Sequence, residues 1–451
     1  MILPDYFLAD LPPEATLTPT MVSEACQTLK RNRAQYLAGR ATESIVSLLA
    51  DVAANWRRHD DPFRQLALAR GPELHRFSRA TLERGLDHFF AELTEENLRA
   101  LVVQELGHAR RLDQFSTSSQ TLALARGPEL LAHVAAGNIP CPTLMSMVLG
   151  LLARSAQFIK CAQGTGFLPR LFAHSLYEAD RKLGACLELA AWPGGSTALE
   201  VALFAEADGV TATGSDATLD AIRLRLPLKT RFLSHGHRVS FGFLAREALS
   251  SAGARRLARA AAEDVAAWDQ QGCLSPHVFY VEERGAVSPE SFAALLAGEL
   301  ARHETEFPRG ELLLHESATI TVKRDFYRVR ATASAETQLW HSEGSTAWTV
   351  IYENDPRFQA SCLNRFVYVK RAASLDDVLH HAELVRGQVS TAGLAAEGDR
   401  ARELAAQLAR WGVTRICPVG RMQRPPLTWR HDGRPALADL VTWTDWEKED
   451  S

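Results

Sequence analysis

The sequence predicts an α/β protein with two doubly wound, Rossmann-like domains. The first observation is length, because 451 residues exceed what one hydrophobic core normally serves. The second is the residue pattern, because from residue 131 onward short apolar runs separated by Gly, Asn and Pro alternate with helical segments. The third is that this alternation resumes near residue 252 and continues to about residue 419. Such a succession is typical of parallel sheets covered by helices.

The individual elements follow from hydrophobic periodicity and from turn residues between the apolar runs. The first hundred residues carry helical periodicity with charged faces and no repeat, so they predict a helical N-terminal region. In chain order, the predicted elements are helices at 22–37 and 44–54, a strand at 131–136, a helix at 142–152, a strand at 157–160, a helix at 200–205, a strand at 209–212, helices at 217–226 and 252–267, and a strand at 277–281.

These elements predict a division into three parts. Residues 1–242 are expected to form the N-terminal helices and a dinucleotide-binding domain, and residues 243–424 a catalytic domain. Residues 425–451 are rich in Pro, Trp and Arg, and we interpret them as a C-terminal arm that closes on another subunit or domain.

Composition and charge exclude several classes of protein. A net charge of −4 and a pI of about 6.4 offer no basic surface, so we expect no nucleic-acid partner. The best membrane candidate, residues 142–152, is about half of the ~20 residues that a membrane span needs. The first residues show no basic stretch followed by an apolar core, so we expect no export signal.

The cysteines and histidines indicate a reducing compartment and no metal site. Seven cysteines are an odd number, widely scattered and without C-x-x-C spacing, which favours free thiols in the cytoplasm over a disulfide framework. The histidines at residues 235–237 and 380–381 lack cysteine or carboxylate partners at ligand spacing. We therefore interpret them as surface or packing residues.

Cys273 is the strongest candidate for a nucleophile. It follows Gly272 and precedes a strand-like run, so its thiol lies in a turn and is not committed to a helix or a sheet ladder. Gly272 lets a substrate carbonyl approach the sulfur and the neighbouring backbone N–H closely. Taken alone, Cys273 could equally be a small buried core residue.

Two further turns place polar groups after predicted strands. Asn138 lies in a Gly-Asn-Ile-Pro turn, where its amide can donate to an oxyanion that forms on a carbonyl attacked by Cys273. Gly214 and Ser215 lie in a Thr-Gly-Ser-Asp segment before a helix, where backbone N–H groups suit a pyrophosphate. Each turn has a plainer explanation, because Asn138 also tolerates turn geometry and Ser215 also suits a helix N-cap.

The whole arrangement resembles the aldehyde dehydrogenase superfamily. Residues 133–140, 158–160 and 213–216 precede the cysteine turn in the order that these enzymes use for oxyanion donor, ribose-binding lysine, pyrophosphate turn and nucleophile. The resemblance implies an aldehyde dehydrogenase-like fold with a small oligomerisation arm, and hence a homo-oligomer. It also implies that Asn138 donates to the oxyanion and that Lys160 contacts the cofactor ribose or its phosphate.

A closer resemblance is to the acyl-CoA reductase family that includes the fatty-acid reductase of bacterial bioluminescence. It extends over roughly residues 130–446, and several of the shared strings are long. The strings that carry it are residues 231–242, 269–277, 412–416 and 429–433.

Two departures from oxidising aldehyde dehydrogenases carry mechanistic meaning. Those enzymes have a water-activating glutamate just before a Gly-Gly pair, whereas residues 238–242 contain no carboxylate. They also bind the adenosine ribose with the acid of a Lys-Pro-Ser-Glu segment, whereas residues 160–163 read Lys-Cys-Ala-Gln. Loss of that negative charge favours NADPH over NADH. The glutamate that usually binds the nicotinamide ribose is also missing near residues 361–364.

The resemblance predicts NADPH-dependent reduction of a fatty acyl thioester to an aldehyde through an S-acyl-Cys273 intermediate. The acyl donor is acyl-CoA or an acyl-transferring partner enzyme, as for the bioluminescence relatives. Three alternatives stay open: an NAD(P)-dependent aldehyde dehydrogenase acting oxidatively, a cysteine acyltransferase without redox chemistry, and a non-catalytic assembly protein. No general base is assigned, since we interpret His277 as the start of the next strand and His235 and His237 as organisers of the interdomain cleft.

Overall fold

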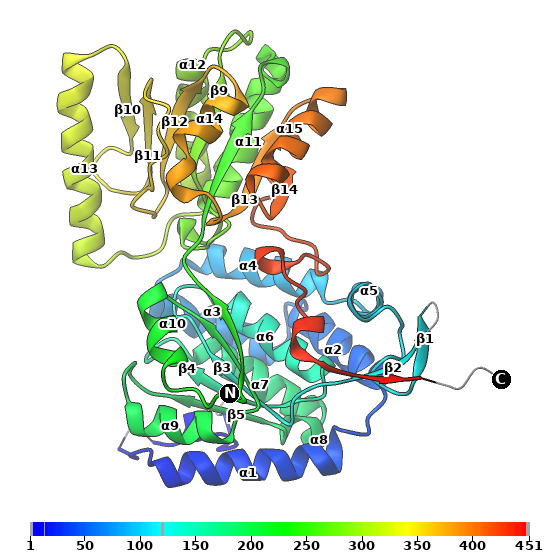
Figure 1. Cartoon of the computed structure of the whole chain (residues 1–451). Helices are drawn as coiled ribbons and strands as arrows, with labels where there is room; N and C mark the ends of the chain where they lie inside the picture. Colours follow the sequence, from blue (N-terminus) through cyan, green and yellow to red (C-terminus); the bar gives the residue numbers. More distant parts are fainter. Residues whose placement is uncertain (1–2, 13, 119–120, 448–451) are drawn as a thin grey trace.

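Two large sheets and one small sheet organise the chain, as Figure 1 shows for the computed structural model, which describes residues 3–12, 14–118 and 121–447. The first sheet has five parallel strands in the order β5-β4-β3-β6-β7. The second has seven strands in the order β10-β11-β12-β9-β8-β13-β14, and only β10 runs antiparallel to its neighbour. The predicted α/β class with two doubly wound sheets is confirmed.

A layer of helices precedes the first sheet. Each of four helix starts is capped by a polar side chain that accepts a hydrogen bond from the backbone N–H three residues on. The capping residues are Thr18, Asp61, Ser78 and Thr94. The helices are α1 (Pro19–Tyr36), α2 (Thr42–Trp56), α3 (Pro62–His75), α4 (Arg79–Glu92) and α5 (Glu95–Leu106). Their apolar faces share one core with the first sheet.

The first sheet reverses its strand order between β3 and β6, since β3 pairs with β4 on one side and with β6 on the other. Such a switch point opens a crevice at the carboxyl ends of the strands. The strands are β3 (Leu130–Val134), β4 (Ala156–Cys161), β5 (Leu187–Ala191), β6 (Gly209–Thr213) and β7 (Arg231–His235). The helices are α6 (Cys141–Leu152), α7 (Phe167–Ala179), α8 (Arg181–Gly184), α9 (Thr197–Glu206) and α10 (Asp216–Arg223).

The second sheet is buried at its centre, where every residue of β8 and β9 is buried, as expected for parallel strands covered on both faces. Its strands are β8 (Val239–Leu244), β9 (Pro276–Glu282), β10 (Thr337–His341), β11 (Thr349–Glu353), β12 (Phe366–Ala372), β13 (Val389–Ala395) and β14 (Arg415–Pro418). Its helices are α11 (Ser251–Ala266), α12 (Pro289–Glu306), α13 (Leu314–Ala333), α14 (Leu375–His381) and α15 (Gly398–Trp411).

Two predicted boundaries differ from the structure. The domain boundary predicted at residue 242 falls inside β8, which pairs with β9 and β13, so we propose that the domains divide between residues 236 and 238. The helix predicted at 217–226 ends at Arg223, because Pro227 disfavours helical geometry in the residue before it.

The C-terminal tail returns from the second sheet to the first domain, as the red segment in Figure 1 shows. Its last strand, β15 (Thr442–Trp446), pairs with β2 (Thr121–Arg126), which pairs with β1 (Ser116–Ser118). The tail is anchored where the Glu105 carboxylate accepts hydrogen bonds from the backbone N–H groups of residues 436–438. Within the described part of the chain, none of the helices combines the length and apolar character of a membrane span.

Candidate active site

The connection between the two domains brings two sheet edges face to face. Strand β7 ends at His235 and β8 begins at Val239, so the carboxyl edge of the first sheet meets the amino edge of the second. Asn138 follows β3 and Lys160 lies near the end of β4, both at the first edge. Cys273 precedes β9 at the second edge. The fold thus brings the predicted nucleophile and the predicted cofactor-binding turns to one cleft.

The turn before Cys273 is left-handed over three successive residues. Trp268, Asp269 and Gln270 have φ angles of 50°, 50° and 65°, although none of them is glycine. Such geometry costs on the order of 1 kcal/mol or more per residue and persists only where surrounding contacts enforce it. Trp268 supplies one such contact, because its ring packs edge-on against Phe77 in the core of the first domain at a centroid distance of 5.2 Å.

Helix α4 closes over the Trp268 ring. A Cβ atom at Gly85 would lie 2.1 Å from that ring, so only glycine permits this approach. The cysteine turn therefore belongs to the second domain by chain position and is held by the first through Trp268.

A second left-handed turn, at residues 363–365, holds the turn at residues 268–270 in place. Leu363, Asn364 and Arg365 have φ angles of 62°, 58° and 64°. Arg365 is 1% exposed and ion-pairs with Asp269, which is 5% exposed, at an Nη2–Oδ1 distance of 2.7 Å. Arg365 also contacts Glu304 at 2.6 Å, so its guanidinium joins two carboxylates across the interior of the domain.

Glutamine side chains complete the link between the two turns. The buried Gln270 accepts a hydrogen bond from the backbone N–H of Phe366 at 2.9 Å and donates to the carbonyl oxygens of Phe366 and Pro276. The next residue, Gln271, donates to the side chain of Asn364 at 2.6 Å. Three consecutive residues before Gly272 are thus fixed by side-chain contacts with residues 364–366.

Cys273 itself lies in a desolvated position. Burial and, to a smaller extent, the charge of the Asp432 carboxylate raise the pKa of its thiol to about 11, although Arg238 offsets part of the effect. The backbone carbonyl of Cys273 accepts a hydrogen bond from the Ser240 hydroxyl at 2.8 Å. No acceptor on another described residue takes the Cys273 backbone N–H, which lies near its own sulfur, so this donor is available to an oxyanion that forms at that sulfur.

Asn138 lies beside the cysteine turn. Its side-chain amide donates to the backbone carbonyl of Gln271 at 2.8 Å, although 133 residues separate the two in sequence. The amide has a second N–H, so this bond orients the group without using all of its donors. Gly272 keeps space open nearby, since a Cβ atom there would lie 3.4 Å from the Ile139 side chain.

A cavity of about 700 Å³ opens at Cys273 between the domains. Its apolar lining includes Met145 and Leu149 of α6, the helix that the sequence suggested as a wall, and Phe89 of α4. Cys141 and Cys417 also line it, but Cys141 begins α6 and Cys417 lies within β14. Burial raises the pKa of all three thiols, to about 12 for Cys141 and about 11 for the others.

The lining also carries positive charge. Arg84 and Arg424 both contact the Glu263 carboxylate, at 3.2 and 3.3 Å. Arg421 is exposed, and its guanidinium has no hydrogen-bond or ion-pair partner among the described residues. The cavity therefore combines apolar walls with an arginine that is free to meet an anion.

The predicted cofactor-binding residues lie at the carboxyl edge of the first sheet. Lys160 is 6% exposed; burial lowers the pKa of its ammonium and Glu200 partly offsets this. No hydrogen bond or ion pair to the Lys160 ammonium occurs within the described residues. Gly214 and Ser215 join β6 to α10, and the Ser215 hydroxyl accepts a hydrogen bond from the Thr218 N–H as the N-cap of α10. The N-cap explanation of Ser215 is thus what the structure shows. The Gly214 N–H donates to the His235 carbonyl at 3.2 Å, so the N–H groups from Ser215 onward are the ones this turn offers to a pyrophosphate.

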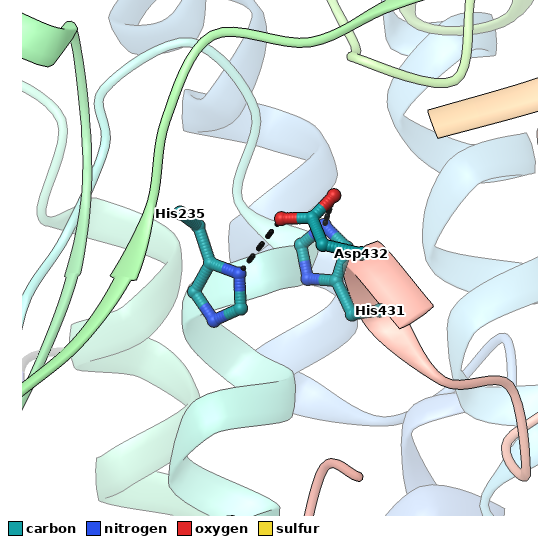
Figure 2. A group of neighbouring side chains, drawn as sticks. All are labelled: His235, His431 and Asp432. Atoms are coloured by element: carbon teal, nitrogen blue, oxygen red, sulfur yellow. Dashed lines mark hydrogen bonds and ion pairs between the residues drawn. The ribbon is translucent and has the colours of Figure 1, made fainter. Parts of the chain in front are cut away.

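The structure also brings together residues that sequence reasoning did not combine. His235 at the end of β7 contacts Asp432 of the C-terminal tail, and the ring of His431 stacks on the ring of His235, as Figure 2 shows. His235, His431 and Cys273 line the same cavity. The string at residues 429–433 was visible in the sequence, but nothing in it shows that a tail 160 residues downstream lies beside the nucleophile.

The remaining histidines of the cleft have other surroundings. His277 lies within β9, accepts a hydrogen bond from the Ser361 N–H at 3.1 Å and is buried, which lowers its pKa to about 4. It begins the strand, as interpreted from the sequence. His237 does not line the cavity that holds Cys273.

Comparison with known proteins assigns the family. Residues 37–443 match the family described as acyl-CoA reductase (LuxC). The chain is 23% identical over 355 residues to the long-chain acyl-protein thioester reductase of Aliivibrio fischeri, which covers 77% of this chain and 70% of that protein. It is 21% identical over 411 residues to the protein of the same name from Photorhabdus laumondii, covering 90% of this chain and 82% of that protein.

Solved structures identify the fold. An NAD-dependent benzaldehyde dehydrogenase from Corynebacterium glutamicum superposes with a TM-score of 0.71 at 13% identity, over 96% of this chain and 91% of that one. A bifunctional proline utilization A protein superposes with a TM-score of 0.73 at 18% identity over 98% of this chain, which spans 46% of that protein's length. The fold is that of aldehyde dehydrogenases, and with the match over residues 37–443 the chain belongs to the acyl-CoA reductase (LuxC) family.

Proposed function

We propose that the protein reduces a long-chain acyl thioester to the aldehyde through an S-acyl-Cys273 intermediate. The observation that carries the proposal is that a cysteine directly after a strained turn opens onto a largely apolar cavity of about 700 Å³, with its backbone N–H not taken by any other described residue and the tethered Asn138 amide at the same turn. Proteins bind drug-sized molecules in cavities of roughly 300–1,000 Å³, so this one has room for a long acyl chain.

The residues of the chain divide the chemistry between them. The Cys273 sulfur attacks the thioester carbon, and the developing oxyanion receives hydrogen bonds from the Cys273 backbone N–H and from Asn138. The C–S bond of the donor then breaks, its thiol leaves, and the acyl group stays on Cys273. A nicotinamide cofactor, when bound in the crevice by Lys160 and the turn before α10, would supply the hydride that the acyl carbon requires. The cysteine thiolate then leaves, which releases the aldehyde and regenerates Cys273.

The acyl donor is proposed to be acyl-CoA or an acylated partner protein. The relatives from Aliivibrio fischeri and Photorhabdus laumondii are long-chain acyl-protein thioester reductases, which supports the second source. The exposed Arg421 at the cavity supports a donor with phosphate groups, which coenzyme A carries. Both donors deliver a thioester to the same cysteine.

NADPH is the proposed cofactor. The crevice fits a dinucleotide, because Lys160 offers an unpaired and largely buried ammonium at the carboxyl edge and the turn before α10 offers backbone N–H groups. Gln163, in the turn after β4, is neutral and exposed, so no carboxylate there repels a 2′-phosphate. Lys160 would contact the ribose or its phosphate. Ser215 would contact the pyrophosphate through its backbone N–H, and Gly214, whose own N–H donates to His235, would let the pyrophosphate approach the turn.

We also propose that the protein forms a homo-oligomer and works in a reducing compartment. The three-stranded sheet of β1, β2 and β15 presents β15 as an exposed edge strand, which supports homo-oligomerisation through the predicted arm. All seven cysteines are free thiols, which supports a reducing compartment such as the cytoplasm.

The test combines the purified protein, NADPH and a series of acyl-CoAs of increasing chain length, with NADPH absorbance and aldehyde formation followed together. We expect aldehyde in equal amount to the NADPH consumed for the wild type, and none for Cys273→Ala. Conversion of free aldehyde and water to acid without any thiol acceptor would instead identify an oxidative dehydrogenase. Acyl transfer without NADPH consumption would identify an acyltransferase, and full activity of Cys273→Ala would refute the covalent scheme.

A further inference from the structure

A histidine–carboxylate pair has no role in the scheme above, although its histidine lines the cavity of Cys273 and its carboxylate raises the pKa of the Cys273 thiol. The Nδ1 atom of His235 lies 3.2 Å from the Oδ2 atom of Asp432. The ring of His431 stacks on that of His235 with a centroid distance of 4.5 Å (Figure 2). His235 lies at the end of β7 in the first sheet, and Asp432 lies in the C-terminal tail. The pair therefore forms because the tail runs back from the second domain to the first.

The Cys273 thiol needs a proton acceptor. The thiolate is the nucleophile, whereas burial and the Asp432 carboxylate raise the pKa of this thiol to about 11, so the protonated form dominates at neutral pH. The proton must therefore leave the sulfur as the sulfur attacks. A resting thiolate, as found in cysteine enzymes whose thiol has a depressed pKa, does not fit these surroundings.

Two other histidines of the cavity are engaged elsewhere, and a third, His88, is buried beside Arg424 and Arg84, which lowers its pKa to about 4. His133 has both ring nitrogens in hydrogen-bond range of side chains, at 2.6 Å from Thr211 and 2.8 Å from Gln157. The Nε2 atom of His303 lies 3.3 Å from Arg84. His235 differs from these, because its Nδ1 atom contacts a carboxylate and its Nε2 atom has no recorded hydrogen-bond partner among the described residues.

The carboxylate fixes the tautomer of His235. Burial alone would raise the pKa of Asp432, but the hydrogen bond from His235 and the charges of His431 and Arg238 outweigh it and lower this pKa to about 2. A carboxylate only accepts hydrogen bonds, so Nδ1 of His235 carries the hydrogen and Nε2 keeps the lone pair. His431 lacks such orientation, since its Nε2 atom is 3.9 Å from the nearer carboxylate oxygen.

Metal binding is the competing explanation of this cluster, because one ligand atom from each of the three side chains lies within 4.8 Å of the others. The rings of His235 and His431 are nearly parallel, with an interplanar angle of 7°. Lone pairs in parallel ring planes run side by side and do not converge on one ion. Arg238 also ion-pairs with Asp432 at 3.3 Å and already neutralises the carboxylate.

We propose that His235, oriented by Asp432, is the general base and acid for acyl transfer to Cys273, an inference that rests on the proposed function. The Nε2 atom takes the proton of the Cys273 thiol as the sulfur bonds to the thioester carbon. The imidazolium, stabilised by Asp432, gives that proton to the sulfur of the departing thiol as the donor C–S bond breaks. The step thus conserves protons and electrons, and it involves no cofactor.

The charged groups around His235 and Asp432 come from several elements. Arg238 from the connection between β7 and β8, Arg434 from the tail and Arg415 from β14 are the cations near these groups. Arg238 and Arg434 lower the pKa of His431, and Arg238 also lowers that of Asp432. Burial lowers the pKa of His431 to about 4, so the stacked ring is neutral and adds no charge at neutral pH.

The experiment measures acyl transfer alone. Enzyme without cofactor is mixed with tetradecanoyl-CoA, quenched in acid at increasing times, and analysed by intact mass for the acyl adduct. At pH 7 we expect His235→Gln to acylate on the order of a hundredfold more slowly than wild type. Its rate should rise tenfold per pH unit as thiolate forms, so the gap to wild type narrows in alkali. Added imidazole should accelerate His235→Ala, and Asp432→Asn should slow acylation at pH 7, because an amide can donate to Nδ1 and so no longer fixes the tautomer of His235.

His237→Gln is the matched control, because it changes a histidine two residues away that does not line the cavity, and it should keep the wild-type rate. Melting temperatures show whether each variant is folded. An unchanged rate and pH profile for both His235→Gln and Asp432→Asn would overturn the inference while leaving S-acyl-Cys273 intact. A wild-type protein that never gains the acyl mass would overturn the proposed function itself.

Discussion

The two sides of the cleft are built very differently. On the Cys273 side, three left-handed residues are enforced by a second left-handed turn, a buried ion pair and two glutamine side chains. On the cofactor side, the turns after β3 and β6 are ordinary ends of parallel strands, and Asn138 and Gly137 are exposed. The difference indicates that the position of the proposed nucleophile is fixed before any ligand binds, whereas the proposed cofactor selection depends on a few charges.

The largest effect should come from removing the buried cation behind the cysteine turn. Arg365→Met leaves the Asp269 and Glu304 carboxylates without their shared partner, so we expect a loss of about 3–5 kcal/mol in the free energy of unfolding. Arg302→Met, which removes a 41% exposed arginine from two surface carboxylates, should cost at most about 1 kcal/mol. Urea unfolding followed by fluorescence measures both, and equal losses would show that the turn is not specially held.

Substitution of Asn138 tests whether its side-chain amide, which donates to the Gln271 carbonyl across the cleft, serves catalysis. Asn138→Ala removes the side-chain oxyanion donor, so we expect kcat to fall by about a hundredfold to a thousandfold. Asn32 is a matched control, because its amide likewise donates to a backbone carbonyl, that of Ala185 at 2.7 Å, in another part of the first domain. If Asn138→Ala and Asn32→Ala show the same steady-state kcat, Asn138 only tolerates its turn.

The preference for NADPH over NADH should change when single charges are altered at the carboxyl edge of the first sheet. Lys160→Met should weaken NADPH binding about tenfold and NADH binding less, since loss of one partly screened charge contact costs on the order of 1 kcal/mol. Gln163→Glu should also disfavour NADPH, by repelling a 2′-phosphate. Fluorescence titration measures both dissociation constants, with Lys229→Met at the opposite edge of the sheet as control. Equal weakening of NADH and NADPH by Lys160→Met would contradict a role in phosphate selection.

The smallest effect is expected at the cavity mouth. Arg421→Ala should raise KM for acyl-CoA a few-fold without changing kcat, because an exposed charge contact is weak and is screened by salt. The same acyl group on pantetheine, which lacks the phosphates, serves as the control and should be used equally well by both enzymes. An equal change in KM for both substrates would show that Arg421 shapes the acyl pocket and does not recognise phosphate.

The two sides of the cleft also differ in how much of each could be predicted from the sequence. Parallel strands and their crossover helices leave local signals, so the elements around β3, β4 and β6 were identified to within a few residues. The family resemblance identified Cys273 and Asn138, and the structure shows Asn138 bonded to the cysteine turn. Their assigned roles stay predictions that the experiments above test.

Other features had no local signal. Left-handed backbone at Trp268 or Arg365 goes against the preference of both residue types, so no sequence rule indicates it. The contact between His235 and Asp432 joins residues 197 positions apart and depends on the path of the C-terminal tail. The boundary predicted at residue 242 falls inside β8, and the boundary that we propose instead had no signal because the connection between β7 and β8 is too short to be recognised as a linker.

The most direct test of the central claim is peptide mapping of the acylated enzyme. The protein is loaded with tetradecanoyl-CoA in the absence of cofactor, digested, and searched for the acyl mass on the three cysteines that line the cavity, Cys141, Cys273 and Cys417. We expect one adduct, on Cys273, that disappears as aldehyde forms when NADPH is added. An adduct on Cys141 or Cys417 instead, or aldehyde formation with Cys273 never modified, would contradict the account.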